Sequence, residues 1–288
     1  MADDLRHLKS AYPGRTHSGL TAPTYDFSAA VVFLPKSREL TQYLLHTVVT
    51  GSQGKPVFLV GEKRAGIESA AKLLTHFGPT YKLDSARHCQ LWQCNVEQPV
   101  NERPLTEWQQ RFSCNDLDII SLPGVFSHGR LDKGTALLLD HLDNLPTGHW
   151  LDFGCGAGVI GATLKKHTPS AEVSMLDVDG FAIQSSQLTL AANKLEAQLI
   201  HGVGIQSAPH DLSAIITNPP FHQGVHTHYQ ATEQLIRDAA KHLRPNGELR
   251  MVANSFLKYP PLLEQHLGPC TLLAERNGFS VYSVRRAV

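Results

Sequence analysis

The sequence lacks an excess of charge of either sign. Lysine plus arginine and aspartate plus glutamate each number 26 in 288 residues, which gives a formal net charge of zero. The two signs are balanced in both halves of the chain. A global basic field that draws a protein onto nucleic acid is therefore excluded, and any attraction to a polyanion has to come from a local patch.

Cysteine is scarce, and long apolar runs are absent. The five cysteines are scattered without the close pairing of a metal site, which favours reduced thiols over a disulfide frame. No signal-type apolar core opens the chain, and no apolar run approaches the length of a membrane span. Hydrophobic residues make up 42% of the chain, so a packed core is expected. We expect a cytoplasmic protein without a metal site or a membrane anchor.

The chain is organised around residues 151–159, which read LDFGCGAGV. An apolar run that ends at Phe153 gives way to three alternating glycines and then to a helical pattern from Val159 to Lys166. The glycines are Gly154, Gly156 and Gly158. Because glycine lets the backbone turn sharply and approach a ligand, this pattern predicts a strand, a ligand-binding turn and a helix start. Many α/β proteins, however, have such a turn for packing alone.

An acid follows the glycines at the end of the next expected strand, Ala171 to Leu176. Asp177 and Asp179 lie about twenty positions after the glycines, where a bound ribose would present its hydroxyl groups. A carboxylate can accept both hydroxyl protons. We interpret Asp177 as the ligand-binding acid and Asp179 as the N-cap of the next helix, while the alternative is that either acid only caps that helix.

A second chemically informative stretch is Asn218-Pro219-Pro220-Phe221, which ends an expected strand from Ser213 to Thr217. The two prolines stop the strand and hold the chain rigid. An asparagine carbonyl and a backbone carbonyl can accept the two protons of a planar amino group, and Phe221 can stack on the ring that carries it. Alone, such a sequence is often only a turn. At a strand end of this sheet it falls in the crevice where α/β folds bind ligands.

The first half of the chain contains a similar strand, loop and helix. Strand Pro56 to Val60 leads through residues 61–66 into a helix from Ile67 to Phe77. Between its glycines this loop carries long charged side chains that would crowd a nucleotide, so no second cofactor site is expected. A helix is expected from Leu105 to Phe112, and a domain boundary after Ser121. The basic residues Lys63, Arg64, Arg87 and His88 are either a phosphate-contacting face or solvated surface charge.

Together these motifs resemble the class I S-adenosylmethionine-dependent methyltransferases, with the amino-group-methylating form of the Asn-Pro-Pro-Phe loop. Four segments, 123–127, 151–159, 218–222 and 247–254, are close to the ribosomal RNA small-subunit guanine-N2 methyltransferase (RsmC-like) family. The resemblance extends weakly into the first half. It implies an α/β chain of two tandem Rossmann-like domains, each a mostly parallel sheet flanked by helices, the second closed by an antiparallel hairpin. Residues 1–121 would form a degenerate, structural or RNA-binding domain, and residues 122–288 the catalytic one.

The resemblance also implies a set of site residues. S-adenosylmethionine would lie across the glycine turn with its ribose on Asp177, while Asp152 orients the turn or the methionine amino group. Val203, or backbone N–H groups near Gly202, would contact the adenine. The flipped guanine would be held by Asn218 and the carbonyl of Pro219 and stacked on Phe221. The substrate side would be lined by Phe126, Ser127, Leu131, Thr135 and Pro220.

The implied function is methylation of a guanine N2 amine in 16S ribosomal RNA on the assembled small subunit, by a monomer. Three alternatives keep the chemistry but change the acceptor: guanine in large-subunit RNA, an adenine N6 amine, and a glutamine side-chain amide. A further alternative, from another class, is a non-catalytic RNA-binding or subunit-assembly protein. The intact glycines together with Asp177 favour an enzyme.

Overall fold

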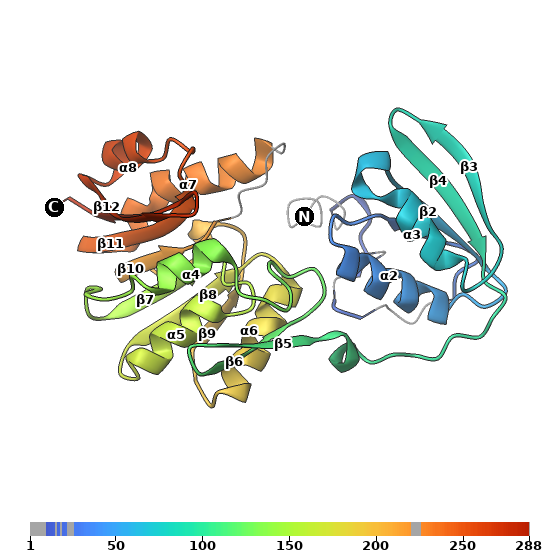
Figure 1. Cartoon of the computed structure of the whole chain (residues 1–288), viewed down its shortest axis with the longest axis horizontal. Helices are drawn as coiled ribbons and strands as arrows, with labels where there is room; N and C mark the ends of the chain where they lie inside the picture. Colours follow the sequence, from blue (N-terminus) through green and yellow to red (C-terminus); the bar gives the residue numbers. More distant parts are fainter. Residues whose placement is uncertain (1–9, 15, 18, 22–25, 220–225, 288) are drawn as a thin grey trace. The chain divides into compact units, whose positions relative to one another are not determined.

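The computed structural model describes residues 10–14, 16–17, 19–21, 26–219 and 226–287. Two compact units make up the chain (Figure 1): one spans Gly14–Gln109, and the other comprises Gln110–Val288 together with Met1–Pro13. This division lies before Ser121, after which the domain boundary was expected. The segment between the two positions is a hairpin that packs on the second unit.

The second unit is built on a seven-stranded sheet in the order β12-β13-β11-β10-β7-β8-β9. Neighbouring strands are parallel except where β13 pairs antiparallel with β11 and β12. The strands are β7 (His149–Phe153), β8 (Glu172–Asp177), β9 (Gln198–His201), β10 (Leu212–Thr217), β11 (Leu243–Asn254), β12 (Cys270–Arg276) and β13 (Phe279–Arg285). The predicted closing hairpin is confirmed, because Asn277 and Gly278 both have positive φ and make a two-residue turn.

Helices cover both faces of this sheet (Figure 1), so the predicted α/β class is confirmed. On one face α4, α5 and α6 pack in a row, and on the other lie α7 and α8. The helices are α4 (Lys133–Leu139), α5 (Val159–His167), α6 (Gly180–Ala192), α7 (His226–His242) and α8 (Pro260–His266). Fully buried Leu151, Ile215, Ile236 and Leu263 belong to the core under α7 and α8. Since strand side chains alternate between faces, Asp152 points to the α4–α6 side.

The first unit has a smaller sheet in the order β1-β2-β4-β3, with α2 and α3 side by side on one face (Figure 1). Its elements are β1 (Ala30–Phe33), α2 (Arg38–Thr50), β2 (Pro56–Glu62), α3 (Ile67–Leu74), β3 (Thr80–Ala86) and β4 (Cys89–Asn95). Only β1 and β2 pair in parallel, so the expected mostly parallel sheet is found in the second unit and not here. The cause is a hairpin: Arg87 and His88, both at positive φ, join β3 to β4 too tightly for a crossover.

The expected helix over residues 105–112 is wrong. A single 3-10 turn, η2 (Leu105–Trp108), is followed by β5 (Gln110–Cys114), which pairs antiparallel with β6 (Leu117–Ser121). The hairpin turn is made by Asn115 and Asp116, both in the left-handed region. Leu105, Trp108 and Phe112 have helical spacing, but pairing with β6 decides the conformation of the residues after Trp108.

Candidate functional site

Three strands of the second unit end in register at the centre of the sheet. Leu176 of β8, Phe153 of β7 and Thr217 of β10 form one row across the strands. The next residues along the three strands are Asp177, Gly154 and Asn218. The strand order reverses between β7 and β10, and this is the position where open α/β sheets bind ligands at the carboxyl ends of their strands. The fold therefore brings together the three motifs that the sequence singled out.

The glycine turn leaves open space where a ligand would approach. Gly154, Gly156 and Gly158 have φ of 74°, 54° and 81°, a region that side chains disfavour. A Cβ added to Gly154 would meet nothing within 4 Å, and one added to Gly156 would meet only Val125 Cγ1 at 3.9 Å. By contrast, a Cβ on Gly158 would meet Met175 Cε at 2.9 Å. The first two glycines thus border open space, whereas Gly158 allows close packing.

Asp152 lies buried beneath the turn. Its Oδ2 accepts the N–H of Gly161, in the first turn of α5, at 2.8 Å. Its Oδ1 is buried without a hydrogen-bond partner. Burial raises the pKa of this carboxyl to about 7, and the charge of Asp177 adds to the rise. The buried oxygen can still accept a proton donor such as an ammonium group.

Asp177 occupies the edge of the turn. Its Oδ2 accepts the Gly156 N–H at 3.0 Å, and its Oδ1 accepts the Asp179 N–H at 2.9 Å. Burial raises the pKa of the Asp177 carboxyl, and these hydrogen bonds oppose the rise. Each oxygen keeps a second lone pair for a ligand hydroxyl. Asp179 caps α6 by accepting the Phe181 N–H at 3.0 Å, as the sequence predicted.

Hydroxyl groups on α6 hold the turn from behind, and sequence reasoning missed them. Ser186 Oγ donates to the Gly156 carbonyl at 3.0 Å, and Thr189 Oγ1 donates to the Ala157 carbonyl at 2.8 Å. Ser185 Oγ accepts the N–H of Leu122, next to β6, at 3.0 Å. The signal for this anchoring was present as buried polar residues at helical spacing, 185, 186 and 189, on one face of the helix.

Asn218 is bound by the N-terminus of α4. Its Nδ2 donates to Asp132 Oδ2 at 3.0 Å and to Thr135 Oγ1 at 2.8 Å. Asp132 Oδ2 also accepts the Thr135 N–H at 2.9 Å, so the predicted N-cap role of Asp132 is confirmed. Its contact with Asn218 was not predicted. Thr135, expected to line the substrate side, therefore lies against the asparagine that was expected to bind the acceptor amine.

The other residues predicted for the substrate site differ in burial and in backbone conformation. Pro219 is buried, whereas Pro220 and Phe221 lie outside the described residues. Phe126 is 54% exposed, Ser127 has a positive φ of 57°, and Leu131 is half-buried.

The segment expected to contact the adenine follows β9. The Gly202 N–H donates to the carbonyl of Asp177 at 3.0 Å, so this backbone group is already used. The half-buried Val203 accepts a hydrogen bond from Ser207 through its carbonyl. Of the two residues expected to contact the adenine, Val203 is thus the remaining candidate.

These observations fit a nucleoside with a charged amino-acid tail, such as S-adenosylmethionine. The turn has no side chain at Gly154 and Gly156, so a ligand can lie against its backbone. Asp177 has lone pairs available to a ribose. The buried Asp152 oxygen without a partner matches the need of an ammonium group.

Comparisons with known proteins point to one group of relatives. A family model described as methyltransferase small domain matches residues 116–283, and one described as its N-terminal domain matches residues 1–112. The chain is 60% identical to a ribosomal RNA small subunit methyltransferase C of Ectopseudomonas mendocina, over 99% of this chain and 87% of the relative. It is 57% identical to the protein of that name from Pseudomonas aeruginosa strain LESB58, with the same coverage.

Among solved structures, the chain resembles a T. thermophilus 16S rRNA N2 guanine methyltransferase in complex with AdoMet and guanosine. The TM-score is 0.79 at 26% sequence identity, and the match covers 90% of this chain and 73% of that one.

Proposed function

The chain belongs to the ribosomal RNA small subunit methyltransferase C family, and from this premise we propose that it methylates a guanine N2 amine in 16S ribosomal RNA with S-adenosylmethionine as donor. One observation carries the proposal: the row of strand ends sets Asn218 beside the open glycine turn and Asp177. An acceptor for amine protons thereby adjoins a site that fits the methyl donor.

Each residue has a distinct role in this reaction. Asp177 binds the ribose, the glycine turn lies against the cofactor, and Asp152 orients the turn or the methionine amino group. Asn218 Oδ1 and the Pro219 carbonyl accept the two amine protons of a guanine flipped out of its stack. These hydrogen bonds draw the nitrogen lone pair out of conjugation with the ring. The reaction then depends on alignment more than on a strong base.

The cofactor supplies an electrophilic methyl group on a sulfonium. In the transfer, the nitrogen–carbon bond would form as the carbon–sulfur bond breaks, with the electron pair of the broken bond left on sulfur. The surplus proton of the amine would pass to solvent. The protein residues named above bind and orient the reactants throughout.

The proposed substrate is the assembled small subunit. A net charge of zero gives the chain little general affinity for naked RNA. The T. thermophilus relative acts on guanine 1207, and we propose the corresponding guanine as the target here. The protein would act in the cytoplasm as a monomer. Among the residues that the structure describes, no helix is long and apolar enough to cross a membrane.

The first unit is proposed to bind RNA rather than cofactor, within a non-catalytic domain of residues 1–121. The Lys63 N–H donates to the His88 carbonyl at 2.9 Å, so the loop before α3 adjoins the β3–β4 turn. Lys63, Arg64, Arg87 and His88 are all exposed there. No ion pair involves any of the four within residues 26–219 and 226–287. An exposed basic cluster of this kind suits contact with phosphate groups.

The test of the proposed reaction uses isolated small subunits, labelled S-adenosylmethionine and mass mapping of the methylated nucleotide. Asn218→Ala should lower turnover at least a hundredfold, since one of the two amine contacts is lost. Its affinity for S-adenosylmethionine, measured by calorimetry, should stay within about twofold, because Asn218 lies on the acceptor side. Near-normal turnover in this variant would contradict the assignment.

The same mapping separates the alternative functions. Label on large-subunit RNA, on an adenine or on a protein glutamine would replace the guanine assignment. Wild-type protein that bound no S-adenosylmethionine would favour a non-catalytic assembly protein.

The RNA-binding role of the first unit is tested by charge reversal. Lys63→Glu combined with Arg87→Glu should raise KM for the small subunit about tenfold and reduce its dependence on salt. Lys72→Glu, an equally exposed change on α3, is the control and should leave KM nearly unchanged. Equal KM values for the two proteins would contradict this role.

A further inference from the structure

The side-chain amide of Asn218 has both of its N–H groups committed. One donates to Asp132 Oδ2 at 3.0 Å and the other to Thr135 Oγ1 at 2.8 Å. Thr135 Oγ1 is itself 3.5 Å from Asp132 Oδ2, in the donor direction, so its lone pairs remain available to the amide. The three side chains thus form a small network in which Asn218 acts only as a donor.

This network decides which way the amide faces. A rotated amide would place its carbonyl oxygen against the Asp132 carboxylate, where two acceptors repel each other. The observed orientation therefore leaves Oδ1 on the opposite side of the amide. A carboxylate that accepts from the amide N–H also polarises the amide and makes Oδ1 a stronger acceptor. The outward-facing group is the one that an acceptor amine requires.

We infer that Asp132 and Thr135 are positioning residues for methyl transfer: they hold the Asn218 amide with its oxygen toward the amine that is methylated. The inference rests on the proposed function, because it assigns a role within that reaction. Neither residue needs to touch the reacting atoms. Their effect passes through Asn218: both side chains fix the direction of its amide, and Asp132 also places a negative charge beside it.

The N-terminus of α4 is held in place by close packing. A Cβ on Gly134 would meet the Phe279 ring of β13 at 3.0 Å and Asp132 Oδ2 at 3.0 Å. Glycine at this position therefore lets the start of the helix approach β13. This packing fixes the end of α4 that binds Asn218.

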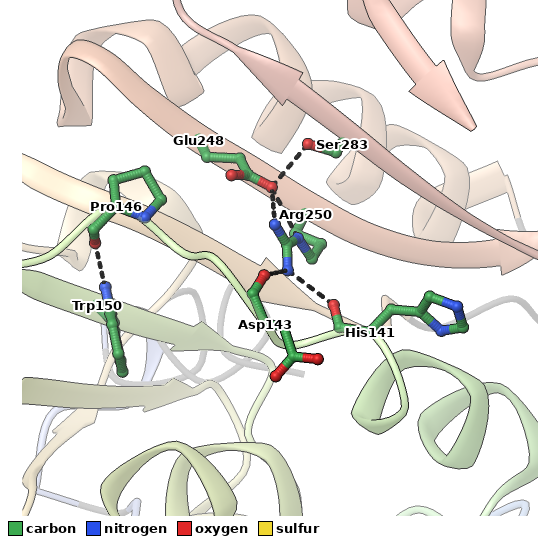
Figure 2. Close-up of polar contacts among 7 residues, drawn as sticks. All are labelled: His141, Asp143, Pro146, Trp150, Glu248, Arg250 and Ser283. Carbon is green, nitrogen blue, oxygen red and sulfur yellow. Dashed lines mark hydrogen bonds and ion pairs between the residues drawn. The ribbon is translucent and has the colours of Figure 1, made fainter. Parts of the chain in front are cut away.

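The opposite end of α4 is held by a buried ion pair. Figure 2 shows Arg250 of β11 between Glu248 and the chain that follows the helix. The Arg250 Nη1 donates to the carbonyls of His141 and Asp143 at 2.7 and 2.8 Å, while Glu248 Oε1 accepts from the guanidinium at 2.7 Å and from Ser283. Both ends of the helix are thereby fixed, which gives Asp132 and Thr135 a defined position relative to Asn218.

The test begins with Thr135, whose side chain can be changed with little change in shape. Thr135→Val removes the acceptor for one amide N–H, and Thr135→Ser keeps it. Thr135→Val should lower kcat about tenfold, because a misdirected amide loses alignment with the amine. KM for the small subunit and the affinity for S-adenosylmethionine should change less than about twofold. Thr135→Ser should recover most of the lost turnover.

Asp132 is tested by Asp132→Ser, since serine is also a good N-cap but is too short to reach Asn218. It should lower kcat by a similar factor while the melting temperature stays close to that of the wild type. A double-mutant cycle under single-turnover conditions then separates positioning from general damage. In an Asn218→Ala background, Thr135→Val should cause no further loss, because the amide on which Thr135 acts is gone.

A second measurement does not depend on turnover. The side-chain amide signal of Asn218, identified by its loss in Asn218→Ala, should exchange slowly with solvent in the wild type and faster in Thr135→Val. Full turnover in Thr135→Val and Asp132→Ser, or losses that multiply with that of Asn218→Ala, would overturn the inference while the proposed function stands. Wild-type protein that methylates no guanine would overturn both.

Discussion

The chain contains two strand–turn–helix segments of similar design, and only the second has the open turn that we propose for S-adenosylmethionine. Both helices begin after a glycine in the left-handed conformation: Gly66 at φ 87° precedes α3, and Gly158 at φ 81° precedes α5. Counted back from each helix start, Glu62 and Arg64 stand where the second segment has Gly154 and Gly156. The glycine that both segments share therefore starts a helix. Gly154 and Gly156, which have no counterpart in the first segment, border the open space.

The strands around the two turns differ as well. β2 continues through Glu62 into the 3-10 turn η1 (Lys63–Ala65), and a Cβ on Gly61 would meet Leu34 Cβ at 2.6 Å. Val60 replaces Asp152 at the matching position. In the second unit, the parallel strand β8 lies beside β7 and ends in Asp177. The strand in the matching position beside β2 is β4, which runs antiparallel and so presents no carboxylate at the same edge of the sheet. The proposed ligand site thus requires a neighbouring parallel strand as well as the turn.

The largest loss of binding is expected when Gly156 of the second turn is replaced by arginine, the residue at the matching position of the first turn. Gly156→Arg adds a long side chain at φ 54° in the open space that we propose for the cofactor. We expect the affinity for S-adenosylmethionine to fall about a thousandfold, roughly 4 kcal/mol, and methylation to be lost with it. Calorimetry measures the binding, and thermal unfolding shows whether the protein remains folded.

Two variants control for other causes of this loss. Gly156→Ala carries the same backbone strain, on the order of 1 kcal/mol, but fills little of the space, so most of the binding should remain. Arg64→Gly in the first turn should create no second binding site. If Gly156→Arg bound the cofactor normally, the two turns would not differ in the way described.

The two turns also show how much of the site was predictable from sequence. A strand, alternating glycines and a helix are neighbours along the chain, so local patterns sufficed to predict residues 149–167. The position of Asp177 at the end of a parallel strand was predicted from its spacing after the glycines. The register that sets Thr217 beside Phe153 depends on strands far apart in sequence, and no local pattern encodes it.

The features that the sequence did not predict also depend on residues far apart along the chain. Asn218 and Asp132 are 86 positions apart, and the α6 hydroxyls bind a turn about 30 residues away. Likewise, the helix expected through Phe112 is replaced by a hairpin because β6 supplies a pairing partner. In each case a contact distant in sequence outweighs or adds to a local preference.

A smaller effect, on stability, is expected from a change at Asp152. The matching residue before the first turn is Val60. Because burial raises the pKa of this carboxyl from 3.8 to about 7, its contribution to stability is present at pH below 3.8 and is lost as the pH rises toward 7 and above. Asp152→Asn keeps the acceptor for the Gly161 N–H but does not titrate. We expect it to stabilise the protein, and the gain to grow by on the order of 2 kcal/mol between pH 5 and pH 8.

Urea unfolding at the two pH values measures this change. A gain for Asp152→Asn that did not vary with pH would show that the carboxyl titrates outside this range.

The smallest difference in stability is expected between substitutions at Gly66 and Gly158, the glycines at matching positions of the two turns. Gly66→Ala and Gly158→Ala place the same side chain at nearly the same φ, so both should lose about 1 kcal/mol to backbone strain. At Gly66 the new Cβ meets nothing within 4 Å, whereas at Gly158 it meets Ser186 Cα at 3.1 Å as well as Met175. Overpacking should therefore cost Gly158→Ala about 1 kcal/mol more in urea unfolding. Equal losses would show that both glycines serve the helix start alone, and that close packing of α5 on β8 and α6 does not distinguish the second turn from the first.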